Sequence, residues 1–393
     1  MKQRINTRAR TQQRRPEGAK GRFFAAIIGC ALLSIGSGAA EAANKSKVSV
    51  YQHGKPVASL PCETNPGTLP RTNPLLSRTA VLMGGGLDVK DAFSWMIAKM
   101  AQCADGSVGV AGNFVVIRAG GNPSYDSFIA KLGPLASVVT LVVPNRETAL
   151  DPANVAVFAT YIQNAGAIWL TGGDQGDYYT YWKGTPLESL LSDQAKRFGI
   201  PIGGTSAGMM ILSQLNYVAI PVSVESADAL LDPYKAWQPP QEAPLDLVMD
   251  FWSNEQPPFS PLLSTVTDSH FHNRDRMGRL ISFLGRSIVE GKVDRANARA
   301  IGVDQETALL MECEDYSCLN TPVLKVIGNP KTSGAAYILK ATPNSKFIVE
   351  QATPLTLSNV EVQKQQVGGN PMTYEITVNA GVMTSTNVNG SIY

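Results

Sequence analysis

One serine of this 393-residue chain stands in a setting that is typical of a nucleophile. Residues 204–208 read Gly-Thr-Ser-Ala-Gly, the pattern G-x-S-x-G, with Ser206 at the centre. Apolar residues flank the pattern, which predicts a sharp turn from a strand into a helix. The amide of Ala207 would then lie at a helix N-terminus, where it can donate to an oxyanion. A glycine-rich helix start can also be purely structural, and that alternative stays open here.

A serine hydroxyl needs a general base, because it is a poor nucleophile at neutral pH. The chain has three histidines, His53, His270 and His272, and the last two lie in the polar segment 267–279. We predict that His270 is the base. A metal site of Asp268, His270 and His272 and a salt-bridged surface loop are the alternatives for this segment. No metal site is predicted, because no further histidine is available.

The elements around these residues follow a strand, loop, helix pattern. From residue 79 on, short and uniformly apolar runs end in glycine-rich turns that lead into helical segments. Such runs predict an α/β fold with a mostly parallel sheet sandwiched by helices. Ligands collect at the carboxyl ends of strands in these sheets, where the turns at residues 84–86, 120–123, 172–175 and 204–208 fall.

The chain is predicted to have four parts. Residues 1–42 combine a basic stretch, a short apolar core and an A-x-A site, which are the three parts of a signal peptide. Residues 43–78 are an irregular lead-in. Residues 79–320 form the α/β domain, with a proline-rich flap at residues 227–260. Residues 321–393 are rich in Val, Thr, Asn and Gly, which predicts a β-rich C-terminal region.

Composition argues against several classes of partner. Removal of residues 1–42 takes away eight basic and two acidic residues and leaves 26 basic and 30 acidic ones. The remaining chain is weakly acidic, so no nucleic-acid binding is expected. The apolar core of the signal is short for a membrane span, and too little apolar sequence precedes Cys30 for a lipoprotein signal. We expect a secreted or periplasmic protein without stable membrane association after cleavage.

Four cysteines follow the predicted signal peptide, namely Cys62, Cys103, Cys313 and Cys318. In an oxidising compartment an even number predicts disulfides, with three possible connectivities. The residues between Cys313 and Cys318 resemble a hairpin turn, so the favoured pairs are Cys313–Cys318 and Cys62–Cys103. The chain has no C-x-x-C pair, and no zinc site built on cysteines is expected.

Several motifs, taken in order, make the chain similar to a known family. They are Gly-Gly-Gly at 84–86, Thr-Gly-Gly-Asp-Gln at 171–175, Gly-Thr-Ser-Ala-Gly at 204–208, Asp-x-His-Phe at 268–271 with the arginines after it, and Ile-Gly-Val-Asp at 301–304. Over residues 79–310 the chain resembles the cyanophycinases and the related aspartyl dipeptidases. These are serine peptidases on a class I glutamine-amidotransferase-like fold.

The resemblance implies roles for particular residues and no cofactor. It implies Ser206 as nucleophile and His270 as base, with the amides of Gly173 (or Gly172) and Ala207 as oxyanion donors. Arginine forks suit the carboxylates of an aspartyl substrate, and a carboxylate suits an arginyl side chain. The residues implied to line or brace the substrate pocket are Gln175, Asp268, Arg274, Arg276 and Arg279.

The sequence departs from the family at two positions. Ser269 replaces the family's glutamine in Asp-Gln-His-Phe, and Gln305 stands where the family has the glutamate of the triad. A glutamine does not stabilise imidazolium as a carboxylate does. Loss of the carboxylate can lower turnover by a factor on the order of 10⁴. A shift of register would let Glu306 serve, and Glu306 is the acid that we predict. Asp304 and Glu225 are less suitable substitutes.

These features together predict an exported serine exopeptidase. It would hydrolyse cyanophycin, a poly-aspartate with arginine side groups, to β-Asp-Arg dipeptides through an acyl-enzyme on Ser206. An aspartyl dipeptidase is one alternative, and a catalytically impaired, exported binding protein of the same fold is the other. Relatives are often dimers, so a homodimer is a further implication of the resemblance.

Overall fold

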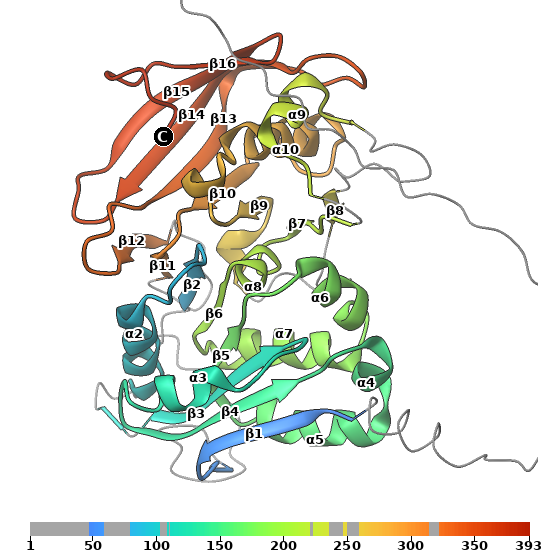
Figure 1. Ribbon diagram of the computed structural model, residues 1–393, viewed down its shortest axis with the longest axis vertical. Coiled ribbons are helices and arrows are strands. Elements are labelled where there is room, and N and C mark those ends of the chain that lie inside the picture. Colours follow the sequence, from blue (N-terminus) through green and yellow to red (C-terminus); the bar gives the residue numbers. More distant parts are fainter. Residues whose placement is uncertain are drawn as a thin grey trace, which may run out of the picture. The chain divides into compact units, whose positions relative to one another are not determined.

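Two eight-stranded sheets run through the part of the chain that the structure describes (Figure 1). The computed structural model describes residues 47–58, 79–102, 108–109, 111–220, 223–235, 247–249, 259–313 and 322–393. The predicted signal peptide, residues 1–42, lies outside the described residues, so this prediction remains a prediction.

The first sheet has the strand order β1-β4-β3-β5-β6-β2-β11-β12. Its five central strands, from β4 to β2, are parallel. The flanking strands β1, β11 and β12 are antiparallel to their neighbours. The strands are β1 (Ser49–Gly54), β2 (Thr79–Met83), β3 (Ala111–Arg118), β4 (Leu135–Val142), β5 (Ala165–Leu170), β6 (Ile202–Thr205), β11 (Thr307–Glu312) and β12 (Val323–Gly328).

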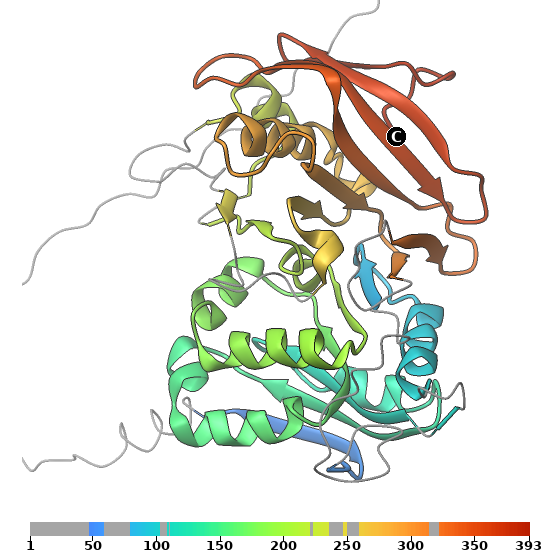
Figure 2. The same cartoon turned by 180° about the vertical axis from the view of Figure 1, so that it is seen from behind.

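Helices cover both faces of this sheet. Successive side chains of a strand point to opposite faces, so each strand contributes to the core on both sides. Val81 of β2 packs with Phe93 of α2, whereas Leu82 packs in a separate core with Phe158 of α5. Figure 2 shows α5 and α7, in green, in front of the sheet. The helices are α2 (Lys90–Ala101), α3 (Ser124–Ile129), α4 (Arg146–Leu150), α5 (Pro152–Ile162), α6 (Gln175–Trp182), α7 (Pro186–Phe198) and α8 (Ala207–Met210).

The second sheet has the order β16-β15-β14-β13-β10-β9-β7-β8. Strand β9 is parallel to both of its neighbours, and the other pairs are antiparallel. Its strands are β7 (Leu215–Tyr217), β8 (Leu247–Met249), β9 (Thr265–Asp268), β10 (Arg299–Val303), β13 (Ala335–Ile348), β14 (Thr356–Gln366), β15 (Met372–Asn379) and β16 (Val382–Ser385). The helical elements around it are α9 (Ser226–Leu231), η1 (Ser260–Leu262), η2 (His272–Arg274) and α10 (Met277–Val289).

The predicted mixture of strands and helices is confirmed, and three parts of the prediction differ. The lead-in contains β1, which pairs with β4. The flap contains α9 and β8, while residues 236–246 and 250–258 lie outside the described residues. The C-terminal strands do not stand apart: β12 extends the first sheet and β13 pairs with β10. The reason is apolar burial, since Tyr337 and Leu339 of β13 pack in one core with α10.

Cys313 is the one cysteine within the described residues, and it is disulfide-bonded. Its candidate partners lie outside the described residues, so the two predicted pairings remain predictions. Among the helices that the structure describes, none combines the length and the apolar character needed to cross a membrane.

Trp182 is fully buried in the core that also contains Leu82 and Phe158. Its ring stacks on Tyr178 with centroids 4.4 Å apart, and its Nε1 donates to the Val143 carbonyl at 2.9 Å. We expect Trp182→Ala to lower the free energy of unfolding by about 3–5 kcal/mol, because it leaves a cavity. Urea denaturation followed by circular dichroism measures this. Val388→Ala, at a side chain that is 98% exposed, is the control and should change stability by less than about 0.5 kcal/mol.

Candidate active site

Ser206 lies at the turn between β6 and α8, where the G-x-S-x-G pattern places it. Its backbone has φ 51° and ψ −118°, a region that residues other than glycine rarely adopt. The flanking glycines permit this turn, because a side chain at Gly204 would meet the backbone of Gly208, and one at Gly208 would collide with the Leu170 carbonyl. The serine is therefore held on a strained turn at the carboxyl edge of the parallel strands.

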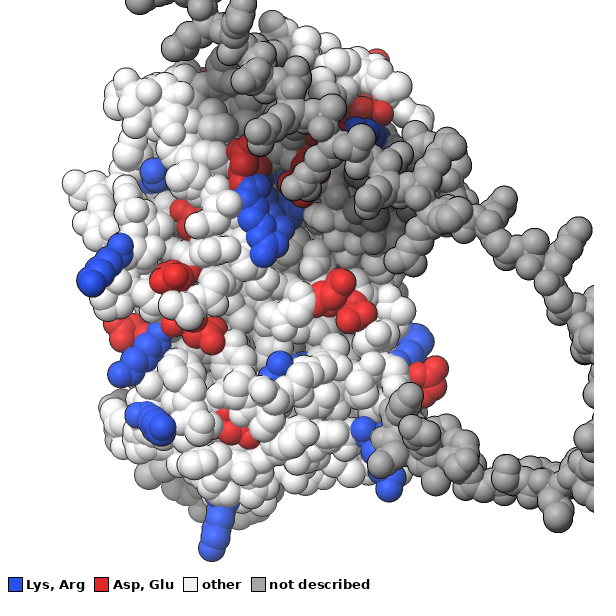
Figure 3. Space-filling model, viewed as in Figure 1, with Lys and Arg blue, Asp and Glu red and all other residues white. Residues whose placement is uncertain are grey.

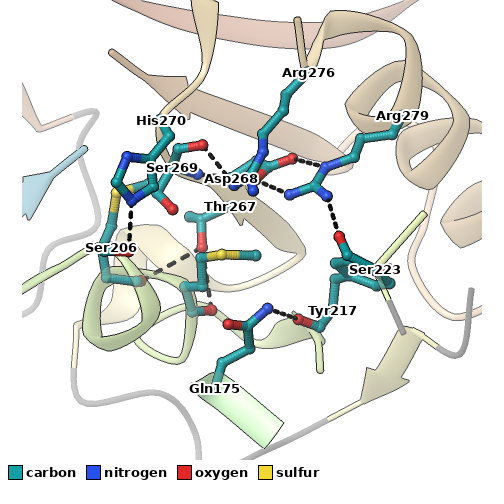
Figure 4. A network of polar contacts seen from close by, with 12 residues as sticks. Gln175, Ser206, Tyr217, Ser223, Thr267, Asp268, Ser269, His270, Arg276 and Arg279 are labelled. Atoms are coloured by element: carbon teal, nitrogen blue, oxygen red, sulfur yellow. Dashed lines mark hydrogen bonds and ion pairs between the residues drawn. The ribbon is translucent and has the colours of Figure 1, made fainter. Parts of the chain in front are cut away.

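His270 follows β9 of the second sheet and reaches Ser206 across the gap between the sheets (Figure 4). Its Nε2 lies 2.8 Å from the Ser206 hydroxyl oxygen. The ring is packed against Gly85, where any side chain would overlap the imidazole. The structure thus brings together the two residues that the sequence predicts as nucleophile and base.

Three successive carbonyl groups at the end of β2 hold this arrangement. The carbonyl oxygens of residues 83–85 accept, in order, from the amides of Ser206, His270 and Glu306, at 3.0, 2.7 and 2.8 Å. A single short backbone segment therefore fixes the serine turn, the histidine and the turn that follows β10. This segment overlaps the Gly-Gly-Gly turn at residues 84–86 that was singled out in the sequence.

Gln305, and not Glu306, is the residue that meets the other ring nitrogen of His270. Its Nε2 lies 2.7 Å from His270 Nδ1. The Glu306 carboxylate instead accepts from Asn329 Nδ2 at 3.4 Å. Asp304 accepts from the backbone amides of His272 and Ala335. This placement corrects the expectation that a shift of register brings Glu306 to the imidazole: the turn at 305–306 is pinned to Gly85, and it aims the neutral amide at Nδ1.

The orientation of the Gln305 amide decides the tautomer of His270. If the NH₂ group faces Nδ1, that nitrogen accepts a hydrogen bond and Nε2 carries the proton. Nε2 then donates to Ser206 and cannot accept the hydroxyl proton. A half-turn of the amide presents its carbonyl oxygen to an Nδ1–H group and leaves Nε2 free to accept. A carboxylate at this position would select the second tautomer alone.

The surroundings of His270 disfavour the imidazolium form. Burial of the ring and the nearby guanidinium groups of Arg274 and Arg276 lower the pKa of His270 from 6.5 to about 4, although Asp268 acts in the opposite direction. The imidazole is therefore neutral at pH 7 and can accept a proton, but it is a weak base.

Two backbone amides near Ser206 suit an oxyanion. Among the described residues, neither the Ala207 amide nor the Gly173 amide has a hydrogen-bond acceptor. Gly172 lies beside the serine: a side-chain carbon built on it would be 3.5 Å from Ser206 Cβ. The Tyr178 hydroxyl fixes this turn, because its single proton can be shared between the carbonyl oxygens of Thr171 and Gly172, at 2.8 and 3.0 Å. The amides of Ala207 and of Gly173 (or Gly172) remain the predicted oxyanion donors.

Asp268 is fully buried and paired with two arginines. Arg279 donates to it from Nε and Nη2, at 2.6 and 2.7 Å, and Arg276 donates from Nη1 at 3.0 Å. Arg279 is itself 1% exposed and also donates to Ser223 and Val224. The resemblance implies that Asp268 and Arg279 either line or brace the substrate pocket. Because both are buried and bound to each other, they have the geometry of a brace.

Arg274 and Gln175 are the more accessible of the predicted pocket residues. Arg274 is exposed, and its guanidinium has no hydrogen-bond or ion-pair partner within the described residues. Figure 3 shows one tight group of basic side chains in the upper middle of this face, with acidic side chains beside it. Gln175 begins α6, and its Nε2 lies 3.4 Å from the Tyr217 carbonyl oxygen (Figure 4).

The alternative of a metal site has no support in the geometry. Asp268 is held by arginines, His270 faces Ser206, and His272 stacks on Tyr393 with centroids 4.5 Å apart. No group of three or more metal-ligating side chains converges within the described residues.

Tyr178 and Tyr217 belong to the site although the sequence did not single them out. Tyr178 holds the oxyanion turn, and Tyr217 lies under the Arg279 guanidinium at 5.2 Å. Tyr178 lies within α6 and contacts backbone carbonyls, whereas Tyr217 is the last residue of β7 and contacts another side chain. Such residues carry no local pattern that a sequence could reveal.

Comparison with known proteins gives relatives of one kind. The cyanophycinase of Geminocystis herdmanii is 25% identical over 291 residues, which cover 72% of this chain and 90% of that protein. The cyanophycinase of Trichormus variabilis is 24% identical over 220 residues, or 55% of this chain and 60% of that protein. The crystal structure of a peptidase from an acI-B1 Actinobacterium superimposes with a TM-score of 0.39 and 17% identity, over 76% of this chain and 98% of that one. No protein-family model matches the chain.

The pKa of His270 can be measured directly. We expect its ring to titrate near pH 4, and to be protonated only below that value, because burial and the arginines destabilise imidazolium. NMR of the ring Cε1–H signals, assigned with His270→Gln, measures the titration. Gln305→Glu places an anion at Nδ1 and should raise the pKa toward 6.5 or above. A wild-type His270 that titrates at 6.5 would contradict this electrostatic account.

Proposed function

We propose that this chain, a relative of the cyanophycinases, is an exported serine exopeptidase that hydrolyses cyanophycin to β-Asp-Arg dipeptides. The observation that carries the proposal is the contact of 2.8 Å between the Ser206 hydroxyl and His270 Nε2, beside two amides suited to an oxyanion. The similarity to curated cyanophycinases supports a peptidase of this family. Export is inferred from the composition of residues 1–42.

The proposed reaction is acyl transfer from a substrate amide to water. Ser206 Oγ bonds to the amide carbonyl carbon while its proton passes to His270 Nε2. The amides of Ala207 and Gly173 donate to the oxyanion that forms. His270 then gives the proton to the leaving nitrogen as the C–N bond breaks, which leaves an acyl-enzyme. A water molecule, deprotonated by the same imidazole, releases the dipeptide and regenerates Ser206.

The substrate would be oriented by the cationic rim of the site. The Arg274 guanidinium is exposed and has no partner among the described residues, and Arg276 is partly exposed at 11% while bound to Asp268. Two guanidinium groups near the nucleophile suit the carboxylates of an aspartate-rich chain, since planar forks bind carboxylates through paired hydrogen bonds. A free cyanophycin chain end would place such a carboxylate close to Ser206.

Digestion of purified cyanophycin tests the function. We expect release of β-Asp-Arg, identified by mass spectrometry, and no release by Ser206→Ala, which lacks the nucleophile. β-Aspartyl and α-aspartyl dipeptides are assayed in parallel, and cleavage of these alone would identify a dipeptidase instead. Clearing of cyanophycin that persists in Ser206→Ala would refute the mechanism.

A neutral residue at His270 Nδ1 favours a second candidate, a binding protein of the same fold with impaired catalysis. Gln305→Glu separates the two. A carboxylate would select the reactive tautomer and stabilise imidazolium, so we expect kcat to rise by a factor on the order of 10²–10⁴. Steady-state assay of dipeptide release measures kcat. Glu306→Gln is the control and should leave kcat unchanged, because the Glu306 carboxylate contacts Asn329 and not the imidazole.

An unchanged kcat in Gln305→Glu would show that the residue at Nδ1 does not limit turnover. Absence of cyanophycin hydrolysis in both the wild type and Gln305→Glu would favour the binding protein.

A further inference from the structure

The segment that carries His270 has an unusual backbone. Residues 270–276 connect β9 to α10, and both His270 and Asp275 have positive φ values, of 48° and 47°. Such conformations cost free energy for residues other than glycine and persist only where surrounding contacts impose them. The position of the imidazole therefore depends on whatever holds this segment, which we call the histidine loop.

The first half of the histidine loop is held by the two sheets. His270 donates its amide to the Gly84 carbonyl at 2.7 Å, and Phe271 donates to the Val303 carbonyl at 3.1 Å. The His272 amide donates to the buried Asp304 carboxylate at 2.8 Å. These bonds fix residues 270–272 but leave the second positive-φ residue, Asp275, to other contacts.

Tyr393 helps to hold the second half, together with Ser226, whose hydroxyl donates to the Asp275 carbonyl, and Arg276, whose guanidinium donates to the Ser269 carbonyl. The Tyr393 hydroxyl donates to Asp275 Oδ1 at 2.7 Å and accepts from the Met277 amide at 3.0 Å. It therefore bridges the end of the histidine loop to the first residue of α10. Burial and the Asp275 carboxylate raise the pKa of Tyr393, so the hydroxyl keeps its proton and can donate.

The ring of Tyr393 contacts the same loop from the side. It stacks on His272 with an interplanar angle of 18° and centroids 4.5 Å apart. It meets Phe271 edge-on at 5.8 Å and Tyr337 of β13 edge-on at 5.9 Å. One side chain thus links the histidine loop to the C-terminal strands through both its polar and its apolar parts.

We propose that Tyr393 is a positioning residue for the reaction, through which the C-terminal strands hold His270 in reach of Ser206. The proposal rests on the proposed function, because it assigns a role within that chemistry. Tyr393 does not touch Ser206 or the imidazole of His270. It acts by keeping Asp275 and Met277 in place, which opposes relaxation of the loop at its second positive-φ residue, Asp275.

The physical consequence concerns both geometry and solvation. Displacement of a catalytic group by about 1 Å can lower a rate by a factor on the order of 10². A looser loop would also admit water to the imidazole, which now lies in a buried setting. Because burial is the largest cause of the low pKa of His270, a looser loop should let this pKa rise.

Tyr393→Phe tests the proposal, because it removes the hydroxyl and keeps the ring. The readout is the second-order rate constant for reaction of the full chain with a fluorophosphonate probe, measured from pH 3 to 8. We expect the rate constant at pH 7 to fall by about tenfold. The acid limb of the pH–rate profile, where protonation of His270 lowers the rate constant, should also move from near pH 4 toward pH 6.5. The charged groups that face His270 are Asp268, Arg274, Arg276 and Arg279, and none of them is changed.

Two further variants separate positioning from a loss of stability. Tyr125→Phe is the matched control, because it removes a tyrosine hydroxyl that also donates to a carboxylate, Asp88 Oδ1, at 3.0 Å. It should leave the acid limb unchanged. Asp275→Asn keeps an acceptor oxygen for Tyr393 and a residue that tolerates positive φ, so it should retain most of the rate.

An unchanged rate and acid limb in Tyr393→Phe would overturn the positioning role while the proposed function stands. An equal loss of rate in Tyr125→Phe would also overturn it, because the effect would then follow stability alone. Lack of any reaction at Ser206 in the wild type would instead mean that the proposed function fails.

Discussion

The contact between Ser206 and His270 depends on a fixed relation between two sheets. The serine follows β6 of the first sheet and the histidine follows β9 of the second. The carbonyl groups of residues 83–85 accept from both, and from the turn that carries Gln305. Any motion of one sheet against the other would stretch these bonds before it separated the hydroxyl from the imidazole. Glycine in this turn lets the backbone lie close to the imidazole of His270, since a side chain at Gly85 would displace the ring.

The cationic groups near the site weaken His270 as a base. Arg274 and Arg276 suit an anionic substrate, yet the same charges help to lower the pKa of His270. Asp268 offsets part of this effect, but it is buried in its pairing with Arg276 and Arg279. With Gln305 at Nδ1, no negatively charged side chain within the described residues touches the imidazole directly. In the reaction we propose, a bound substrate carboxylate would add negative charge to the rim and so favour proton transfer to His270.

Local patterns were sufficient to predict the centre of the site but not its supports. Ser206 is recognisable because a strained turn needs glycine at 204 and 208, whereas the prediction that Glu306 meets the imidazole was wrong, since Gln305 does so. The position of the Glu306 side chain could not be predicted from the sequence, because one backbone hydrogen bond to Gly85 sets the register of that turn. The same holds for β1 and for β13, whose places follow from pairing with strands far along the chain. Tyr393 has no local signal, because the two residues that its hydroxyl contacts lie more than 100 positions away.

The central claim is that the Ser206 hydroxyl is activated by the imidazole of His270. Peptide mapping by mass spectrometry after reaction with a fluorophosphonate at pH 7 tests it most directly. The account predicts one phosphonylated site, Ser206, and a rate lower by a factor on the order of 10³ or more in His270→Ala. Labelling at another residue, or equal rates in the wild type and His270→Ala, would contradict it.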